Sequence, residues 1–211
     1  MRETSKLRKE DERISELVSD LLDKYFYIKF KEFSRINNTI LQTSGIDIVF
    51  KGKHGKNYLC DEKAAIQWIN KPLRTYAFEV SYINRANEIQ KGWLLDEHMV
   101  NNIYLCIYIY EAKVANPSSI EDFIRLTIAA VEKKVILGYF ESIGFTKEKL
   151  LAKSDKVRCN EDEPLGDIYK NGCRFVISRE FVEQPVNVLI SRRKLMELAM
   201  YSKVLKKGRD F

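Results

Sequence analysis

Residues 44–63 read S-G-I-D-I-V-F-K-G-K-H-G-K-N-Y-L-C-D-E-K, and the rest of the chain is interpreted around this stretch. Two short apolar runs, at 46–50 and 58–60, flank a glycine-rich basic turn. Apolar runs on both sides of such a turn predict a β-hairpin, here with a loop longer than two residues. Because side chains two apart on a strand share a face, Asp61 and Lys63 are predicted on one side of the second strand, where Asp47 of the first strand could join them.

This grouping of side chains points to metal chemistry. Asp47 and Asp61 would supply carboxylate oxygens, and the backbone carbonyl of Glu62 a third oxygen, which are the ligands that Mg²⁺ prefers. Such a metal polarises a phosphoryl oxygen and acidifies bound water, and Lys63 would place a cation beside the developing negative charge. Three lysines of the turn are candidates for contact with a phosphate backbone: Lys51, Lys53 and Lys56.

The order of G-I-D-I, a glycine-rich turn and D-E-K resembles the active-site signature of the PD-(D/E)XK, or restriction-endonuclease-like, nuclease superfamily. The resemblance implies that Asp47, Asp61 and Lys63 form a Mg²⁺ (or Mn²⁺) site that hydrolyses phosphodiester bonds of DNA, with RNA as an alternative substrate. Ile46 stands where the family name has proline, and many members lack that proline.

The same resemblance suggests helper residues. Members often use a glutamate of the N-terminal helix, for which Glu16 is the candidate in this chain. Some also carry a Glu or Gln in or just after the strand that follows the lysine, and Glu79 or Gln90 could take that place.

Each part of the motif also has a purely structural interpretation. Asp47 could be an edge-strand charge that opposes aggregation, residues 61–63 a solvated strand end, and the lysines a solvated loop. Two alternatives therefore remain beside the nuclease. One is a catalytically inactive nucleic-acid-binding or protein-assembly module on the same fold, and the other is an unrelated α/β interaction protein in which D-E-K is a coincidence.

Periodicity predicts an α/β (α+β) fold with a mixed sheet flanked by helices, and residues 12–110 fit the core order of the nuclease superfamily. The predicted restriction-endonuclease-like core covers 1–145, and 146–211 form a C-terminal helix–strand elaboration packed on it. A frayed start over 1–10 and a mobile basic tail bracket the fold. The core elements are a helix at 12–33, a hairpin at 45–66, strands at 75–83 and 103–110, and a helix at 119–139.

Composition sets broad limits on function. The 211 residues carry a net charge of +6, which is compatible with a polyanionic partner. The four cysteines form no CxxC pair, so a structural zinc site is not expected. The sequence shows neither a signal-peptide pattern nor an apolar run of about 18 residues, so a cytoplasmic protein without a membrane span is expected. A homodimer is considered because cutting both strands of a duplex often calls for two sites.

Overall fold

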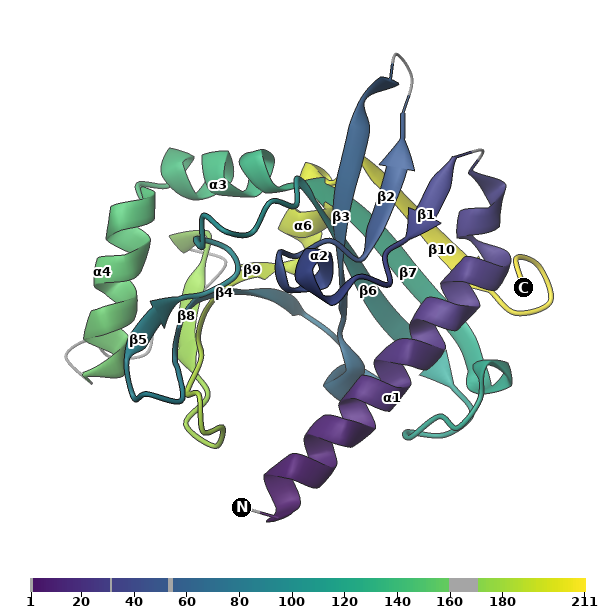
Figure 1. Cartoon of the computed structure of the whole chain (residues 1–211), viewed down its shortest axis with the longest axis horizontal. Helices are drawn as coiled ribbons and strands as arrows, with labels where there is room; N and C mark the ends of the chain where they lie inside the picture. The colour runs from purple at the N-terminus through teal and green to yellow at the C-terminus, as the bar shows by residue number, and fades with distance from the viewer. Residues whose placement is uncertain (1, 31, 53–54, 160–170) are drawn as a thin grey trace. The chain divides into compact units, whose positions relative to one another are not determined.

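The computed structural model describes residues 2–30, 32–52, 55–159 and 171–211, with side chains from Lys9 onward. These residues form a mixed α/β protein with two compact units, each built on its own sheet (Figure 1). Unit 1 comprises Met1–Leu73, Asn101–Val131 and Ala199–Phe211, and unit 2 comprises Arg74–Val100 and Glu132–Leu198. Both units are discontinuous in sequence, so they do not follow the predicted division at residue 145.

The sheet of unit 1 contains the predicted hairpin. Its strand order is β1-β2-β3-β6-β7-β10. Strands β1, β2 and β3 pair antiparallel in sequence order, and β3 pairs parallel with β6, so the sheet is mixed. The strands span Phe33–Arg35 (β1), Ile48–Lys51 (β2), Asn57–Ala64 (β3), Ile103–Ala112 (β6), Phe123–Glu132 (β7) and Tyr201–Lys206 (β10).

Helix α1 (Arg2–Tyr25) lies across one face of this sheet (Figure 1). Its apolar residues recur at three- and four-residue steps, and Val18, Leu21 and Leu22 are almost completely buried. They share one hydrophobic core with Ile48 and Cys60 of the hairpin. The prediction of a frayed segment over 1–10 is wrong, because its many Arg, Lys and Glu residues are good helix formers and extend the helix to Arg2. The helix also ends earlier than predicted, and a 3₁₀ turn, η1 (Tyr27–Lys29), leads into β1.

The helix predicted at 119–139 is wrong over its first half. Ser119 and Asp122 do form a capping box, but it caps only a 3₁₀ turn, η4 (Ile120–Asp122). Strand β7 follows, and helix α3 (Lys133–Ser142) begins only after it. The run F-I-R-L-T-I-A-A-V is rich in β-branched residues, which favour strands. Its place between β6 and β10 overrides the helical spacing of its apolar residues.

The basic tail is also not mobile as predicted. Residues 201–206 form β10, which pairs antiparallel with β7. Leu205 is fully buried and belongs to the core of unit 1. Lys203 and Lys206 lie on this edge strand, where lysines discourage pairing with other chains. The lysines of the tail favoured the prediction of a mobile segment. Burial of the Leu205 side chain in the core instead holds the tail against the sheet.

Unit 2 has a four-stranded sheet of order β5-β4-β9-β8, in which neighbouring strands are antiparallel. The strand predicted at 75–83 is confirmed with its bounds, but it belongs to this second sheet and not to the sheet of the hairpin. The elements of unit 2 are β4 (Thr75–Ile83), β5 (Ile89–Lys91), α3, α4 (Lys147–Arg158), β8 (Arg174–Ile177), β9 (Val186–Ser191) and α6 (Arg192–Leu198). No helix in the described ranges is both long and apolar enough to cross a membrane.

Candidate active site

The hairpin ladder ends where the acidic motif begins. The last pair of β2 and β3 is Ile48↔Cys60. One residue further, the Asp47 N–H donates to the Cys60 carbonyl over 2.9 Å. The backbone N–H of Glu62 then donates to Asp47 Oδ2 over 2.7 Å. The Asp47 carboxylate thus takes the place of a strand carbonyl beside β3 and is held there.

Asp61 and Lys63 lie on one face of β3, as strand alternation predicts. Lys63 Nζ is 2.8 Å from Asp61 Oδ1. The carboxyl groups of Asp61 and Asp47 are close enough to hydrogen-bond with each other. Asp61 is only 3% exposed, although it is an acid. The structure therefore brings together the three residues of the motif, all within unit 1.

The environment of Asp61 disfavours its charged form. Burial raises the pKa of its carboxyl to about 6, and the neighbouring Asp47 carboxyl pushes it in the same direction. The Lys63 amine opposes this rise in pKa without cancelling it. Tyr104 lies opposite Asp61 in the parallel ladder with β6, and burial raises its pKa well above the usual value, so its phenol stays neutral. A buried pair of carboxylates of this kind would be stabilised by a bound cation.

Asp61→Asn is expected to make the protein more stable at neutral pH. The Asp61 carboxyl has a pKa of about 6 in the folded protein, against 3.8 in the unfolded chain. Its contribution to the free energy of unfolding therefore falls as the pH rises from about 4 to about 6, and stays low at higher pH. A shift of that size corresponds to roughly 3 kcal/mol, a net value that already includes the opposing effect of Lys63. Urea unfolding should show a gain of about 3 kcal/mol at about pH 7.5 that vanishes near pH 4. An equal effect at both pH values would contradict the assigned cause.

The donor atoms at this site fit a hard divalent cation. Asp47 and Asp61 supply carboxylate oxygens. The N–H and C=O of one strand residue point the same way, so the Glu62 carbonyl lies on the side of Asp47. Mg²⁺ commonly uses one or two carboxylates and completes its shell with waters and substrate phosphate. Among the described residues, no group of three or more His, Cys, Asp or Glu side chains is placed to hold a metal ion.

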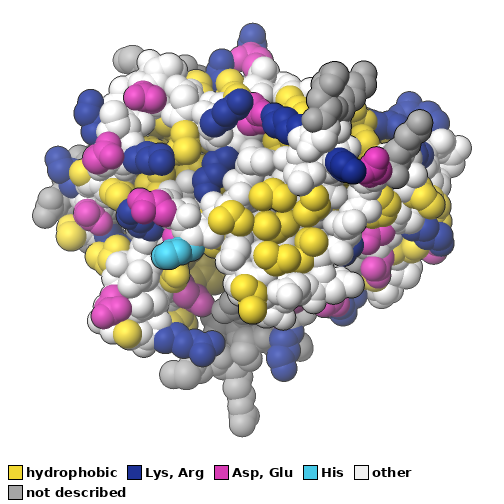
Figure 2. Space-filling view, turned by 45° about the horizontal axis from the view of Figure 1, so that its top comes forward, with side chains coloured by type: hydrophobic (Ala, Val, Ile, Leu, Met, Phe, Trp, Pro, Cys, Tyr) yellow, Lys and Arg dark blue, Asp and Glu magenta, His cyan; other side chains and the backbone are white. Residues whose placement is uncertain are grey.

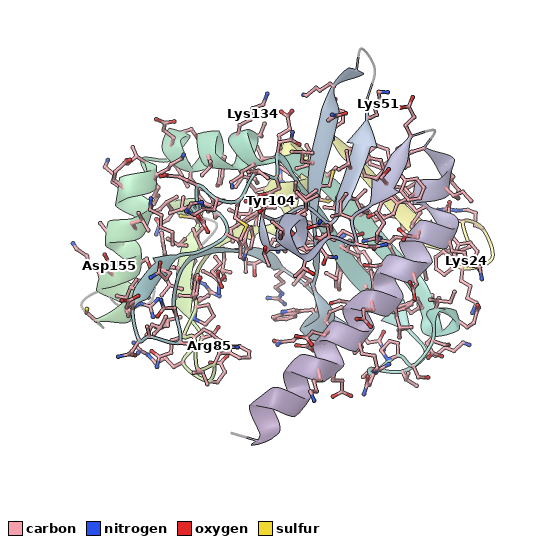
Figure 3. All side chains as sticks on the ribbon, in the orientation of Figure 1. Lys24, Lys51, Arg85, Tyr104, Lys134 and Asp155 are labelled. Atoms are coloured by element: carbon pink, nitrogen blue, oxygen red, sulfur yellow. The ribbon has the colours of Figure 1, made fainter. Side chains whose placement is uncertain are left out.

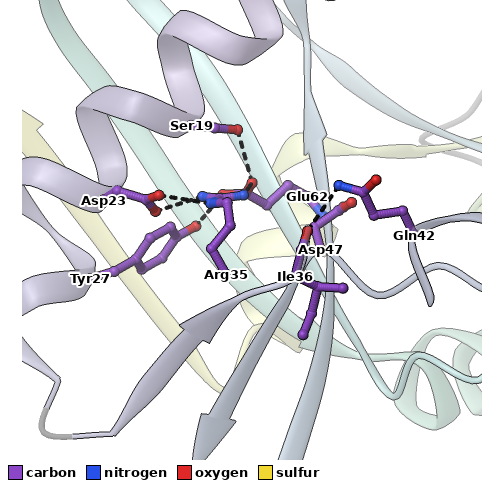
Figure 4. Close-up of polar contacts among 8 residues, drawn as sticks. All are labelled: Ser19, Asp23, Tyr27, Arg35, Ile36, Gln42, Asp47 and Glu62. Carbon is purple, nitrogen blue, oxygen red and sulfur yellow. Dashed lines mark hydrogen bonds and ion pairs between the residues drawn. The ribbon is translucent and has the colours of Figure 1, made fainter. Parts of the chain in front are cut away.

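The Glu62 side chain lies on the other face of β3, toward α1 (Figure 4). It accepts hydrogen bonds from Tyr27 Oη at 2.6 Å and from Ser19 Oγ at 3.0 Å. Arg35 Nη1 lies 2.5 Å from Glu62 Oε2. Arg35 also binds both carboxylate oxygens of Asp23, at 2.7 and 2.8 Å. The predicted metal ligand is the backbone carbonyl of Glu62. The Glu62 side chain instead binds Ser19, Tyr27 and Arg35 on the opposite face of the sheet.

Glu16, one of the suggested helper residues, does not join this group. Glu16 is exposed on α1. The apolar side of that helix covers the face of the sheet that carries Cys60 and Glu62, whereas Asp61 points to the opposite face. Glu79 and Gln90 lie in β4 and β5 of unit 2, where they pair with Asn187 and Tyr82 respectively.

The turn lysines are engaged with neighbouring side chains. Lys51, which lies toward the loop end of β2 (Figure 3), forms an ion pair with Glu32 at 3.0 Å. The Lys56 ammonium sits 4.7 Å from the centre of the Tyr58 ring. Lys53 lies outside the described residues. Figure 2 shows Lys and Arg side chains interspersed with Asp and Glu on the face in view, so the net positive charge forms no single basic patch there.

An apolar cavity of about 250 Å³ lies away from the acidic motif. Its lining includes Cys60 and Leu105, which face α1, together with the aromatic rings of η1 and β2. Because Asp61 and Lys63 point to the other face of the sheet, this cavity does not belong to the proposed metal site. It is framed by a cluster of aromatic side chains: Phe26, Tyr27, Phe30, Phe50, Tyr58 and Tyr201.

The sequence did contain a signal for the network behind Glu62, which the interpretation of the motif missed. Ser19, Asp23 and Tyr27 follow one another at four-residue steps, so they form a polar stripe along one side of α1 and η1. Polar side chains beside the buried apolar side of a helix need hydrogen-bond partners, which residues of the sheet supply here. Arg35 gave no comparable signal, because its segment is polar and is interpreted from sequence only as a turn or an edge strand leading into the hairpin.

No protein-family model, curated protein or solved structure matches this chain.

Proposed function

We propose that this protein is a metal-dependent nuclease of the PD-(D/E)XK type that hydrolyses phosphodiester bonds of DNA. One observation carries the proposal: a buried Asp61 contacts a second carboxylate, Asp47, and a lysine amine 2.8 Å away. Burying two carboxylates side by side is unfavourable. A protein in which Asp47 and Asp61 had no function would therefore be expected to lack this arrangement.

The arrangement of unit 1 supports the same proposal. Helix α1 precedes the β1-β2-β3 meander, and β6 pairs parallel with β3 next to the motif. This order agrees with the helix and strand order expected for the superfamily core. One departure is that the strand predicted at 75–83 within the core is β4 of the second unit, which lies with β5 in the connection between β3 and β6.

The residues would divide the work as follows. Asp47 and Asp61 would hold Mg²⁺ or Mn²⁺, which when bound stabilises negative charge on the phosphate and acidifies water. The Lys63 amine, held by Asp61, would donate a hydrogen bond to the attacking water or to the scissile phosphate. Water oxygen adds to phosphorus, the bond from phosphorus to one sugar oxygen breaks, and the water proton passes to the leaving oxygen. Cutting both strands of a duplex often calls for two sites, which a homodimer would provide.

The second candidate is a non-catalytic nucleic-acid-binding or assembly module on the same fold. It is favoured by the fact that both acids already have protein partners. Asp47 Oδ2 accepts the Glu62 N–H, and Asp61 pairs with Lys63. In such a module these contacts would serve only to fix the end of the hairpin.

A cleavage assay separates the two candidates. Purified protein is incubated with linear DNA, supercoiled DNA and RNA, in Mg²⁺, in Mn²⁺ or in excess EDTA. We expect DNA to be cut with either metal and to remain intact in EDTA, because the carboxylates of Asp47 and Asp61 repel the phosphate unless a bound metal cation neutralises them and stabilises the charge on the phosphate. Binding of nucleic acid without metal-dependent cutting would favour a nucleic-acid-binding module. Neither binding nor cutting would reject both the nuclease and the nucleic-acid-binding module, and would leave the assembly module.

A further inference from the structure

The ion pair between Arg35 and Glu62 reaches across β2. Arg35 belongs to β1 and Glu62 to β3, and β2 runs between these strands. The register Arg35↔Ile48↔Cys60 places all three residues on the α1 face of the sheet. The short Arg35–Glu62 contact therefore spans the end of β2 and ties its two neighbours together (Figure 4).

Asp47, the residue just before β2, lies between the two strands that this ion pair joins. Its carbonyl accepts the N–H of Ile36, the residue after Arg35, over 2.8 Å. Its carboxylate accepts the N–H of Glu62 itself. Residues 61–63 have left the ladder with β2 and pair in register only with β6, so the Glu62 side chain supplies an anchor on the α1 face that the ladder no longer provides.

We propose that Glu62, Arg35 and Tyr27 are positioning residues for the metal site. Glu62 is the middle residue of D-E-K and its side chain is 8% exposed, so its three partners hold it in one orientation. Its backbone N–H then holds the Asp47 carboxylate beside Asp61. This inference rests on the proposed nuclease function and extends it to residues on the opposite face of the sheet.

Two mechanisms could link Glu62 to cation affinity, and they differ in what they predict. Removing the carboxylate would weaken binding of a cation by charge alone, in which case Gln and Ala at position 62 would behave alike. Positioning depends on hydrogen bonds, so Gln, which can still accept from Tyr27 and Arg35, should keep more affinity than Ala. Tyr27→Phe removes one of these bonds with no change of charge and therefore isolates positioning.

The test measures Mn²⁺ dissociation constants by electron paramagnetic resonance on the full chain, together with circular-dichroism melts and DNA cleavage rates. Glu62→Ala should weaken Mn²⁺ binding about 10-fold or more, as is typical for residues that orient metal ligands. Glu62→Gln should recover most of that loss, and Tyr27→Phe should weaken binding several-fold. Glu141→Ala, at an exposed site on α3, is the matched control and should bind as the wild type does.

The outcomes are distinct. Wild-type affinity in Tyr27→Phe and Glu62→Ala, with lowered melting temperatures alone, would show that the network is only structural and would overturn the inference. Equal losses in the Gln and Ala variants with none in Tyr27→Phe would overturn it in favour of simple charge. If Glu62→Ala does not fold, Tyr27→Phe decides, because it keeps its buried ring. A wild type that neither binds Mn²⁺ nor cleaves would instead reject the proposed function.

Discussion

Asp61→Asn is expected to lower the rate of metal-dependent DNA cleavage by about 10³-fold or more, equivalent to roughly 4 kcal/mol of transition-state stabilisation. The physical reason is that Asn keeps the size of the side chain but removes the charge that faces both Asp47 and Lys63. The metal would lose one of two carboxylates, and the lysine would lose the acceptor that fixes its amine. Single-turnover cleavage of a labelled duplex in saturating Mg²⁺ measures the effect.

The same variant should unfold at higher urea concentration than the wild type at neutral pH, for the reason given with its pKa. A loss of activity together with a gain of stability would exclude misfolding as the cause. Asp20→Asn removes the same charge from an exposed position of α1 and should keep the wild-type rate. Cleavage by Asp61→Asn at more than about one tenth of the wild-type rate would contradict the assignment of Asp61 as a catalytic metal ligand.

Arg35→Ala is expected to destabilise the protein by about 3 kcal/mol, because it leaves Glu62 and Asp23 without their cation. The loss should be large for a single ion pair, since the Glu62 side chain is 8% exposed and Arg35 only 22% exposed. Breaking a buried pair by removing one partner costs more than the pair contributes, because the remaining charge stays desolvated. Urea unfolding at neutral pH measures the change in the free energy of unfolding.

A double-mutant cycle provides the control for this prediction. The double variant Arg35→Ala with Glu62→Ala should lose less stability than the sum of the two single variants, with a coupling on the order of 1–3 kcal/mol. The surface pair of Arg193 and Glu197 on α6 offers a comparison, and its coupling should stay within about 0.5 kcal/mol. Additive losses at Arg35 and Glu62 would mean that the contact itself contributes little.

The parts of the fold that could be predicted from sequence are those fixed by local pattern. The basic glycine-rich turn between two apolar runs gave the hairpin, and alternation on β3 placed Asp61 and Lys63 together and Glu62 apart from them. The ladder register then brought Asp47 to Asp61, since Ile48 pairs with Cys60. A strand run with clear alternation, such as 75–83, was also recognised with its bounds.

The parts that could not be predicted depend on partners distant in sequence. Residues 123–132 combine helical spacing of apolar side chains with β-branched residues that favour strands, and pairing with β6 and β10 decides in favour of the strand. Which sheet β4 joins is likewise decided by β9, more than a hundred residues later. Arg35 could not be assigned to the site from sequence because its role exists only once β1, β2 and β3 are side by side.

The strand order of unit 1 has a consequence for how the protein acquires its structure during synthesis. Strand β10 pairs with β7 through contacts such as Tyr201↔Ala130, and the residues between them include most of unit 2. The ribosome therefore makes the β2–β3 hairpin early, but the strand that completes its sheet, β10, is made only with residues 201–206. Until then β7 has an open edge that can pair with other chains. Expression yield should accordingly depend on whether chaperones protect that edge while the remaining residues are translated.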